Sequence, residues 1–170
     1  MDIQSTYNYL TEQQWLYVVK KTYLGDTWKF DGYTNSQDSV KFWYMDLNQD
    51  EFFTRDLLDL LRQETQVDWQ LDTAYANGQT HGLSGELHQD VIGAPAGKYY
   101  TFLYYANPEW HPTWGGNTIF TNPESGATVI KYPTPNSYVL FDSTIWHAGL
   151  EPTRHCKTLR VTVALKLHRP

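Results

Sequence analysis

The sequence predicts a mainly β protein with two N-terminal helices, in which the strands form an antiparallel sandwich or barrel. From residue 67 onward, short runs rich in β-branched and aromatic residues alternate with turns of glycine, proline, asparagine and serine, and no helical pattern lies between them. Before residue 67, apolar residues recur at helical spacing in two places. We therefore expect a single domain over residues 1–170, with helical support in 1–65 and a β core in 67–170.

A capping box marks the start of the first helix. Thr11 is placed to accept a hydrogen bond from the backbone three residues on, and Gln14 to reach back to the cap. We expect the helix to run to about Tyr23 and to end at Gly25-Asp26. Its buried face is predicted to hold Trp15, Val18, Val19 and Tyr23.

The second helix is expected to begin near Asn48 or Asp50 and to continue through residue 65. Its buried stripe is predicted to hold Phe52, Leu57, Leu60 and Leu61. Between the two helices, residues 26–45 have no clear period and are expected to be irregular or extended. Whether this segment forms a lid over a site is left open by the sequence.

Seven later segments have the composition of strands. They are residues 67–76, 86–92, 98–106, 117–122, 127–133, 137–143 and 159–167. Because side chains alternate between the two faces of a strand, Arg160 and Thr162 are expected on one face and Lys157 on the other.

Composition narrows the class of protein further. The net charge of −6 gives no general attraction to nucleic acid or to a membrane surface. Cys156 is the lone cysteine, so no intramolecular disulfide can form, which suits a reducing compartment. The first residues lack the basic and apolar regions of a signal peptide, and no apolar run approaches the roughly 18 residues of a membrane span. We expect a cytoplasmic protein.

The motif His88-Gln89-Asp90 is the strongest functional signal. Residues two apart on a strand point to the same face, so His88 and Asp90 are expected to hold one metal ion from one side. His147, at the end of a distant strand or in the adjoining turn, would complete a set of two histidines and one carboxylate. That set leaves three open positions and is typical of Fe(II) oxygenases. The competing interpretation is a surface His-x-Asp pattern, since the chain contains six histidines.

Five stretches within residues 74–167 resemble, in order and spacing, the Fe(II)/2-oxoglutarate-dependent dioxygenases, and the prolyl-hydroxylase branch in particular. They are ELHQD, TFLYYANPEW, GGNTIF, SYVLFDSTIWHAGLEP and LRVTVALKL. The resemblance implies a double-stranded β-helix core of the jelly-roll or cupin type. It also implies a hydroxylation that releases succinate and CO2 and needs Fe(II), 2-oxoglutarate and O2, with ascorbate as a candidate reductant.

The resemblance implies that His88, Asp90 and His147 are the catalytic iron ligands. Arg160 with Thr162 resembles the Arg-x-Ser/Thr pair that binds the far carboxylate of 2-oxoglutarate, a task suited to a planar guanidinium. Lys157 is the rival for that role. A tyrosine that donates to the same carboxylate is matched by Tyr105, with Tyr100 and Tyr75 as alternatives.

The leading substrate implied by the resemblance is a prolyl residue in a peptide or protein. A free amino acid or other small molecule is the first alternative, and alkylated nucleic acid ranks last because the chain is acidic. Four aromatic residues are candidates for a wall at the site mouth, with ordinary packing as the alternative: Trp110, His111, Trp114 and Trp146. Gly115-Gly116 is interpreted as a structural turn.

Two rival functions come from other classes of protein. One is a cupin-like barrel that binds a metal or small ligand without oxidising anything. The other is a structural accessory protein whose His-x-Asp pattern is accidental. No nucleic-acid or membrane partner is expected for any of these, and a monomer or homodimer is expected.

Overall fold

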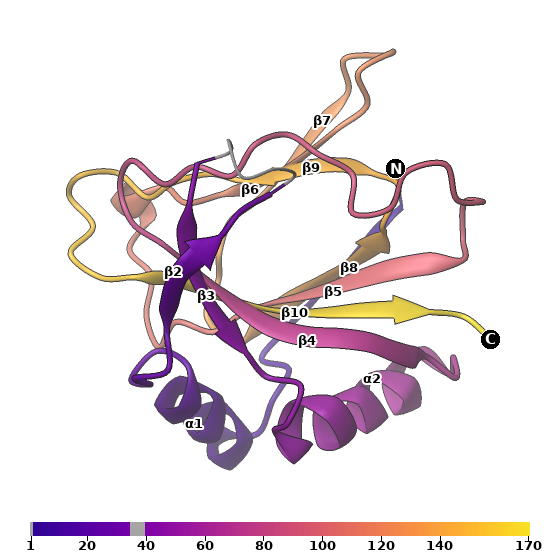
Figure 1. Cartoon of the computed structure of the whole chain (residues 1–170), viewed down its shortest axis with the longest axis horizontal. Helices are drawn as coiled ribbons and strands as arrows, with labels where there is room; N and C mark the ends of the chain where they lie inside the picture. The colour runs from indigo at the N-terminus through magenta and orange to yellow at the C-terminus, as the bar shows by residue number, and fades with distance from the viewer. Residues whose placement is uncertain (1, 35–39) are drawn as a thin grey trace.

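Two antiparallel sheets lie opposite each other in the computed structural model of the chain, which describes residues 2–34 and 40–170 (Figure 1). The large sheet has the strand order β1-β8-β5-β10-β4-β3-β2, and the small sheet has the order β7-β6-β9. The strands are β1 (Ile3–Tyr7), β2 (Lys29–Gly32), β3 (Phe42–Asp46), β4 (Gln70–Gln79), β5 (Tyr99–Tyr105), β6 (Thr118–Thr121), β7 (Thr128–Lys131), β8 (Ser137–Asp142), β9 (Trp146–Gly149) and β10 (Arg160–His168). The predicted fold class, a mainly β jelly roll with N-terminal helices, is confirmed.

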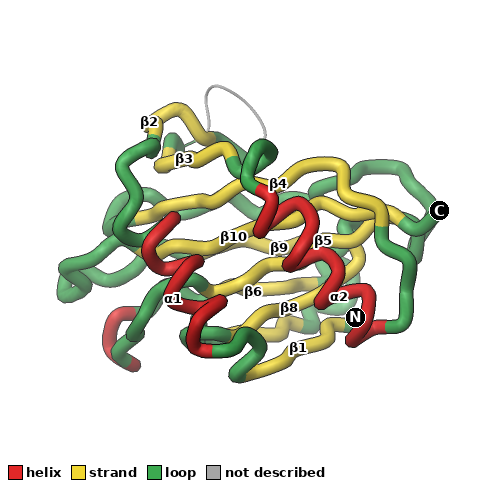
Figure 2. Tube along the Cα trace, turned by 90° about the horizontal axis from the view of Figure 1, so that it is seen from below, coloured by secondary structure: helices red, strands yellow, loops and turns green. Residues whose placement is uncertain are grey.

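Both helices cover the outer face of the large sheet, on the side away from the small sheet (Figure 2). Helix α1 (Glu12–Lys21) begins at the predicted capping box, with Gln14 N donating to Thr11 Oγ1 at 3.4 Å and Thr11 N donating to Gln14 Oε1 at 3.0 Å. Tyr23 follows the helix rather than belonging to it. The part of the chain that the structure describes contains no helix long and apolar enough to cross a membrane.

The second helical segment begins with a π-helical turn, Phe52–Asp56, and continues as α2 (Leu57–Thr65). The wider turn directs Phe53 fully into the core and leaves Phe52 partly buried. Leu57 and Leu61 are buried as predicted, while Leu60 is partly buried against the same core.

Three strands of the large sheet come from the first 65 residues, which the sequence assigned to helical support and an irregular or extended link. β1 pairs with β8, and β2 and β3 extend the opposite edge beyond β4. Residues 35–39, inside the segment considered as a lid, lie outside the described residues.

The strand predicted over residues 86–92 is wrong. Those residues form a loop. Its ladder pairing in the described structure is one isolated β-bridge, between His88 and His147. The bridge is made by His88 N donating to His147 O at 3.0 Å and by the reciprocal bond at 2.8 Å. His147 itself lies inside β9 rather than at a strand end or in a turn.

The alternation of β10, the middle strand of the large sheet, separates the core from the functional face. Val161, Val163, Leu165 and Leu167 pack into the core between the sheet and the helices. The other face of β10 carries Arg160, Thr162, Ala164 and Lys166, which all line one cavity between the sheets. Because both faces are covered, almost every residue of β10 is buried.

Candidate metal centre

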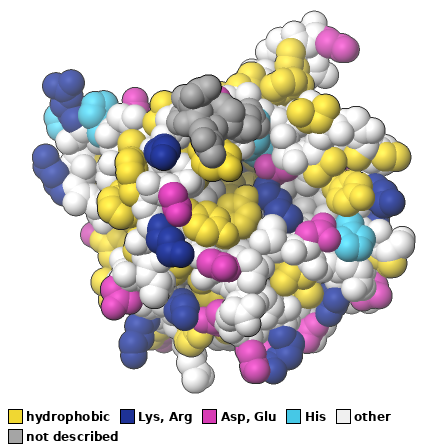
Figure 3. Space-filling model, in the orientation of Figure 1, with side chains coloured by type: hydrophobic (Ala, Val, Ile, Leu, Met, Phe, Trp, Pro, Cys, Tyr) yellow, Lys and Arg dark blue, Asp and Glu magenta, His cyan; other side chains and the backbone are white. Residues whose placement is uncertain are grey.

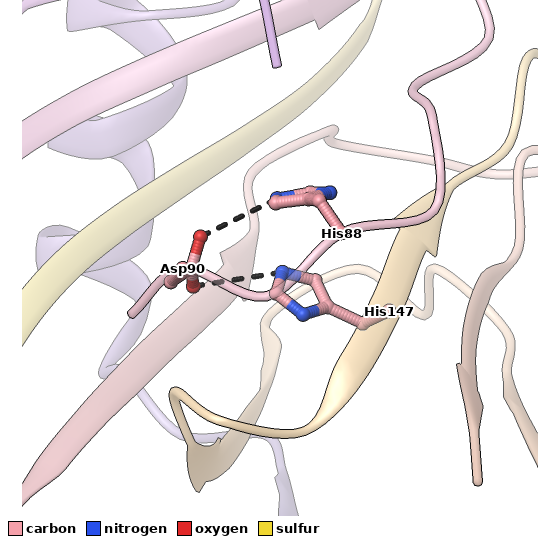
Figure 4. Close-up of side chains that lie close together, drawn as sticks. All are labelled: His88, Asp90 and His147. Carbon is pink, nitrogen blue, oxygen red and sulfur yellow. Dashed lines mark ion pairs between the residues drawn. The ribbon is translucent and has the colours of Figure 1, made fainter. Parts of the chain in front are cut away.

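His88, Asp90 and His147 converge on one point although they come from a loop and from a strand of the small sheet (Figure 4). One ligand atom from each residue lies within 4.8 Å of the others. Asp90 Oδ1 is 3.4 Å from His88 Nε2, and Asp90 Oδ2 is 3.5 Å from His147 Nε2. The two imidazole rings lie 4.3 Å apart between centroids.

The backbone fixes both imidazoles so that Nε2 faces this point. His88 Nδ1 lies 2.8 Å from the Glu86 carbonyl oxygen, and His147 Nδ1 lies 2.8 Å from the Ile145 carbonyl oxygen. A carbonyl oxygen only accepts hydrogen bonds, so each Nδ1 carries a proton, and Nε2 is the ring nitrogen left to face a metal. Metal-binding histidines are oriented in this way by their outer partners.

Charge and burial favour the protonation states that bind a metal. Burial lowers the pKa of His147 to about 4, although Asp90 acts in the opposite direction, so the imidazole is neutral at pH 7. Burial would raise the pKa of the Asp90 carboxyl, but the Lys166 ammonium, the largest opposing influence, holds that pKa well below its usual range. Neutral His147 and ionised Asp90, with His88 oriented by its backbone partner, form a donor set that fits Fe(II).

The three residues open into a cavity of about 460 Å³ between the sheets. A hollow bordered by hydrophobic side chains is visible near the middle of the face in Figure 3. Arg160, which is 2% exposed, lies in the same cavity. Its guanidinium donates to Gly116 O at 2.5 Å, to Gln79 Oε1 at 2.8 Å and to Thr118 Oγ1 at 3.0 Å. Burial lowers the pKa of Arg160 to about 10, so it remains a cation at neutral pH.

Glycines leave the space around this guanidinium open. A Cβ atom at Gly149 would lie 3.5 Å from Arg160 Nη1 and 3.7 Å from Nη2, directly against the two nitrogens best placed to bind a carboxylate. Gly116 has a φ of +70°, and a Cβ there would lie 3.0 Å from Arg160 Cδ. Gly116, interpreted as structural from the sequence, therefore also allows its carbonyl oxygen to approach Arg160. The arrangement forms a small anion cradle, which fits a carboxylate of a 2-oxo acid.

The other predicted co-substrate residues take different positions. Thr162 is buried and lines the cavity beside Arg160. Tyr105 is buried behind the cavity wall, where its hydroxyl donates to Thr118 Oγ1 at 2.9 Å and its ring centroid lies 5.9 Å from Arg160 Cζ. Lys157 is exposed in the loop before β10, away from the cavity-lining residues of the described chain.

Of the two alternative tyrosines, Tyr75 lines the cavity, whereas Tyr100 packs against Trp69 on the helix side of the sheet. The four candidates for an aromatic wall are absent from the described cavity-lining residues, in line with the alternative of ordinary packing. Trp110 packs edge-on against Trp114 at 5.3 Å, and His111 contacts the same ring. Trp146 is partly buried on β9.

The cavity instead takes its aromatic lining from five residues, of which only Tyr75 was named as a site candidate from the sequence: Tyr33, Phe42, Tyr44, Tyr75 and Phe141. Tyr44 and Tyr75 stack at 5.6 Å between ring centroids. Lys166 was missed as well, although it has the same parity as Arg160 on β10. That parity was the signal that would have found it.

Comparison with known proteins agrees with this architecture. Residues 73–167 match the family model of the 2OG-Fe(II) oxygenase superfamily. Curated proteins give no significant sequence match. A prolyl hydroxylase from Trichoplax adhaerens, solved with a peptide of the hypoxia inducible factor oxygen degradation domain, is similar in structure, with a TM-score of 0.70 and 17% identity over 98% of this chain and 83% of that chain.

A prolyl-4-hydroxylase from Pseudomonas putida has a TM-score of 0.67 and 15% identity, over 99% of this chain and 92% of that chain. The α-ketoglutarate-dependent epimerase SnoN from nogalamycin biosynthesis has a TM-score of 0.68 and 13% identity, over 99% of this chain and 80% of that chain. These structures share the fold.

A jelly roll that gathers two histidines and a carboxylate at the mouth of an internal cavity defines a non-haem metal oxygenase class. Since the family model covers more than half of the sequence, the chain belongs to the 2OG-Fe(II) oxygenase superfamily. Membership implies a 2-oxoglutarate-dependent oxygenase that uses Fe(II) and O2.

Proposed function

We propose that this protein is a hydroxylase in which His88, Asp90 and His147 hold Fe(II), and in which Arg160 binds the far carboxylate of 2-oxoglutarate. The observation that carries the proposal is the placement of the His-Asp-His donor set and the buried guanidinium in one cavity. With Fe(II), 2-oxoglutarate and O2 bound, such a site couples decarboxylation of 2-oxoglutarate to succinate with hydroxylation of the substrate.

The residues around Arg160 hold its guanidinium in place for this task. Gln79 Oε1 accepts from Nη1, while the Gln79 amide donates to the carbonyl oxygens of Leu83 and Gly149, so the acceptor cannot rotate away. Thr118 Oγ1 accepts from both Arg160 and Tyr105, which leaves the hydroxyl hydrogen of Thr118 to point into the cavity. In this arrangement Tyr105 supports the carboxylate site through Thr118 instead of touching the carboxylate.

Thr162, on the same face of β10, would contribute a second hydroxyl to the cavity wall. Lys157 has no place in this proposal because its exposed loop lies outside the cavity. The non-oxidising barrel is disfavoured because Arg160 is a buried cation that faces open space at Gly149. Such a cation is suited to binding a carboxylate, and a site that binds only a metal ion does not need it.

For the substrate, we propose a prolyl residue in a peptide or protein. Two of the structural relatives are prolyl hydroxylases, one of them bound to a peptide. The aromatic lining offers flat apolar faces to a five-membered ring. It includes Tyr33, just after β2, and Phe42, at the start of β3. A small-molecule substrate is the second candidate, because the cavity volume of about 460 Å³ is sufficient for one and a relative of this fold is an epimerase.

An anaerobic titration of Fe(II) and 2-oxoglutarate tests the site directly. The expected result is a visible charge-transfer band that is absent in His88→Ala and His147→Ala. Succinate release is then measured with prolyl peptides and, separately, with free amino acids, with and without ascorbate. A folded, metal-loaded protein that gives neither a band nor succinate would leave the non-oxidising barrel as the better description.

A further inference from the structure

The cavity contains a second, partly buried cation, which the proposed function leaves without a task. Lys166 lies on the same face of β10 as Arg160, and its side chain is 20% exposed. Its ammonium forms an ion pair with Asp90 Oδ2. It also lies 3.2 Å from Thr101 Oγ1 and 5.8 Å from the centroid of the Tyr75 ring.

The contacts of the two Asp90 oxygens differ. Oδ2 accepts from Lys166 and also from Thr101 Oγ1 at 2.5 Å. Thr101 is held in turn by Ser143 Oγ at 3.0 Å, and Asp90 N donates to Ser143 O at 3.0 Å. The described contacts of Oδ1 are limited to His88 Nε2 at 3.4 Å. The protein therefore holds Oδ2 with two donors, whereas Oδ1 lies beside His88; Oδ2 is also 3.5 Å from His147 Nε2.

We propose that Lys166 is a positioning residue that restricts Asp90 to binding the metal through Oδ1 alone. This inference rests on the proposed function. A carboxylate can bind a metal ion through one oxygen or two. Two histidines and a singly bound carboxylate would leave three positions open on the metal, enough for a 2-oxo acid and O2 together. A doubly bound Asp90 would occupy one of these positions.

The same ammonium repels the divalent ion. Lys166 thus has opposite effects on the two binding steps: it weakens metal binding through its charge, and it strengthens 2-oxoglutarate binding by keeping a coordination position open. A residue that only stabilised the fold would weaken both steps together when it is replaced. The opposite signs therefore distinguish the two roles.

The test uses Co(II), which stands in for Fe(II) without oxidising, titrated by calorimetry and followed by 2-oxoglutarate titrated into the Co(II)-loaded protein. Lys166→Met removes the charge and keeps the length. It is expected to bind Co(II) about tenfold more tightly, since a unit positive charge close to a divalent ion is lost. It is expected to bind 2-oxoglutarate about tenfold more weakly, at the low end for an outer partner of a metal ligand.

Three further variants control the result. Lys166→Arg is expected to stay within about threefold of the wild type in both steps, because it keeps a charged donor to Oδ2. Thr101→Val removes the other Oδ2 donor without changing charge, so it is expected to weaken 2-oxoglutarate binding severalfold and to leave Co(II) binding unchanged. Lys20→Met, on the exposed side of α1, is expected to change neither step.

The outcomes separate the two proposals. Wild-type protein that binds neither Co(II) nor 2-oxoglutarate would overturn the proposed function. Wild-type protein that binds both, with Lys166→Met unchanged or weakened in both steps, would overturn the role of Lys166 alone. If Lys166→Met does not fold, Thr101→Val decides: unchanged 2-oxoglutarate binding there contradicts the restriction of Asp90 to one oxygen.

Discussion

An Arg160→Ala substitution removes the guanidinium whose Nη1 and Nη2 face the open space at Gly149. Two hydrogen bonds to the far carboxylate of 2-oxoglutarate would be lost, and both are assisted by charge. Hydrogen bonds to charged groups contribute about 1.5–3 kcal/mol each. Two of them amount to about 3–6 kcal/mol, which corresponds to a dissociation constant roughly 10²- to 10⁴-fold higher.

The matched control is Lys157→Ala, which removes the rival cation from an exposed loop. Since Lys157 lies away from the cavity, the dissociation constant for 2-oxoglutarate is expected to stay within about twofold of the wild type. Arg160 also donates to three protein oxygens, and each buried acceptor left without a donor costs about 1–3 kcal/mol. Thermal unfolding of each variant shows whether the protein studied is still folded.

The assay is an anaerobic titration of 2-oxoglutarate into the Fe(II)-loaded protein, with the charge-transfer band as the signal. Fe(II) binding itself should be nearly unchanged in Arg160→Ala, because the arginine does not contact the His-Asp-His set in the described structure. A folded Arg160→Ala protein that retains wild-type affinity, or a larger loss in Lys157→Ala, would refute the assignment of the anchor.

Gly149→Ala places a Cβ atom 3.2 Å from Gln79 Oε1 and against Arg160, so 2-oxoglutarate affinity should fall about tenfold while Co(II) affinity, measured by calorimetry, is kept. Asp142, the last residue of β8, has a pKa held below its usual value because hydrogen bonds from Thr144 and Gly97 outweigh burial. Its carboxylate thus stabilises the fold above about pH 4. Urea unfolding should show Asp142→Asn less stable than the wild type at pH 7, with the difference shrinking as pH falls below 4; a constant difference contradicts this. Leu61→Ala, at a position with 0% exposure, should cost about 2–5 kcal/mol in the same assay, and a loss below about 1 kcal/mol would mean that the core repacks.

Strand parity carried much of the site prediction. The alternation of β10 correctly put Arg160 and Thr162 on one face, and the same rule extends that face to Lys166. Lys157 was assigned to the opposite face of a strand, but it lies in a loop before β10 begins, so the rule did not apply to it. The alternation of side chains between two faces is a property of one strand. It can therefore be predicted from the sequence without knowing which strands pair with it.

The pairings that bring distant segments together could not be read in this way. β1 lies against β8, more than a hundred residues later, and its own five residues give little sign of a strand. The aromatic lining comes partly from β3, whose position at the sheet edge follows from pairing with β4, and from Tyr33 just after β2. Trp110 and Trp114 pack against each other instead, which depends on loop conformation and has no period in the sequence.

The site joins the large sheet to a loop and to the small sheet. Both cations lie on β10, the middle strand of the large sheet, whereas His88 and Asp90 lie in a loop and His147 lies on β9, at the edge of the small sheet. The loop is tied to β9 by the two backbone bonds of the His88–His147 bridge and to the β8–β9 turn by Asp90 N and Ser143 O. Lys166 and Thr101 then connect Asp90 to the large sheet. A metal ion bound by His88, Asp90 and His147 would connect the two sheets through these contacts. Metal binding is therefore expected to stabilise the packing of the two sheets against each other as well as the loop.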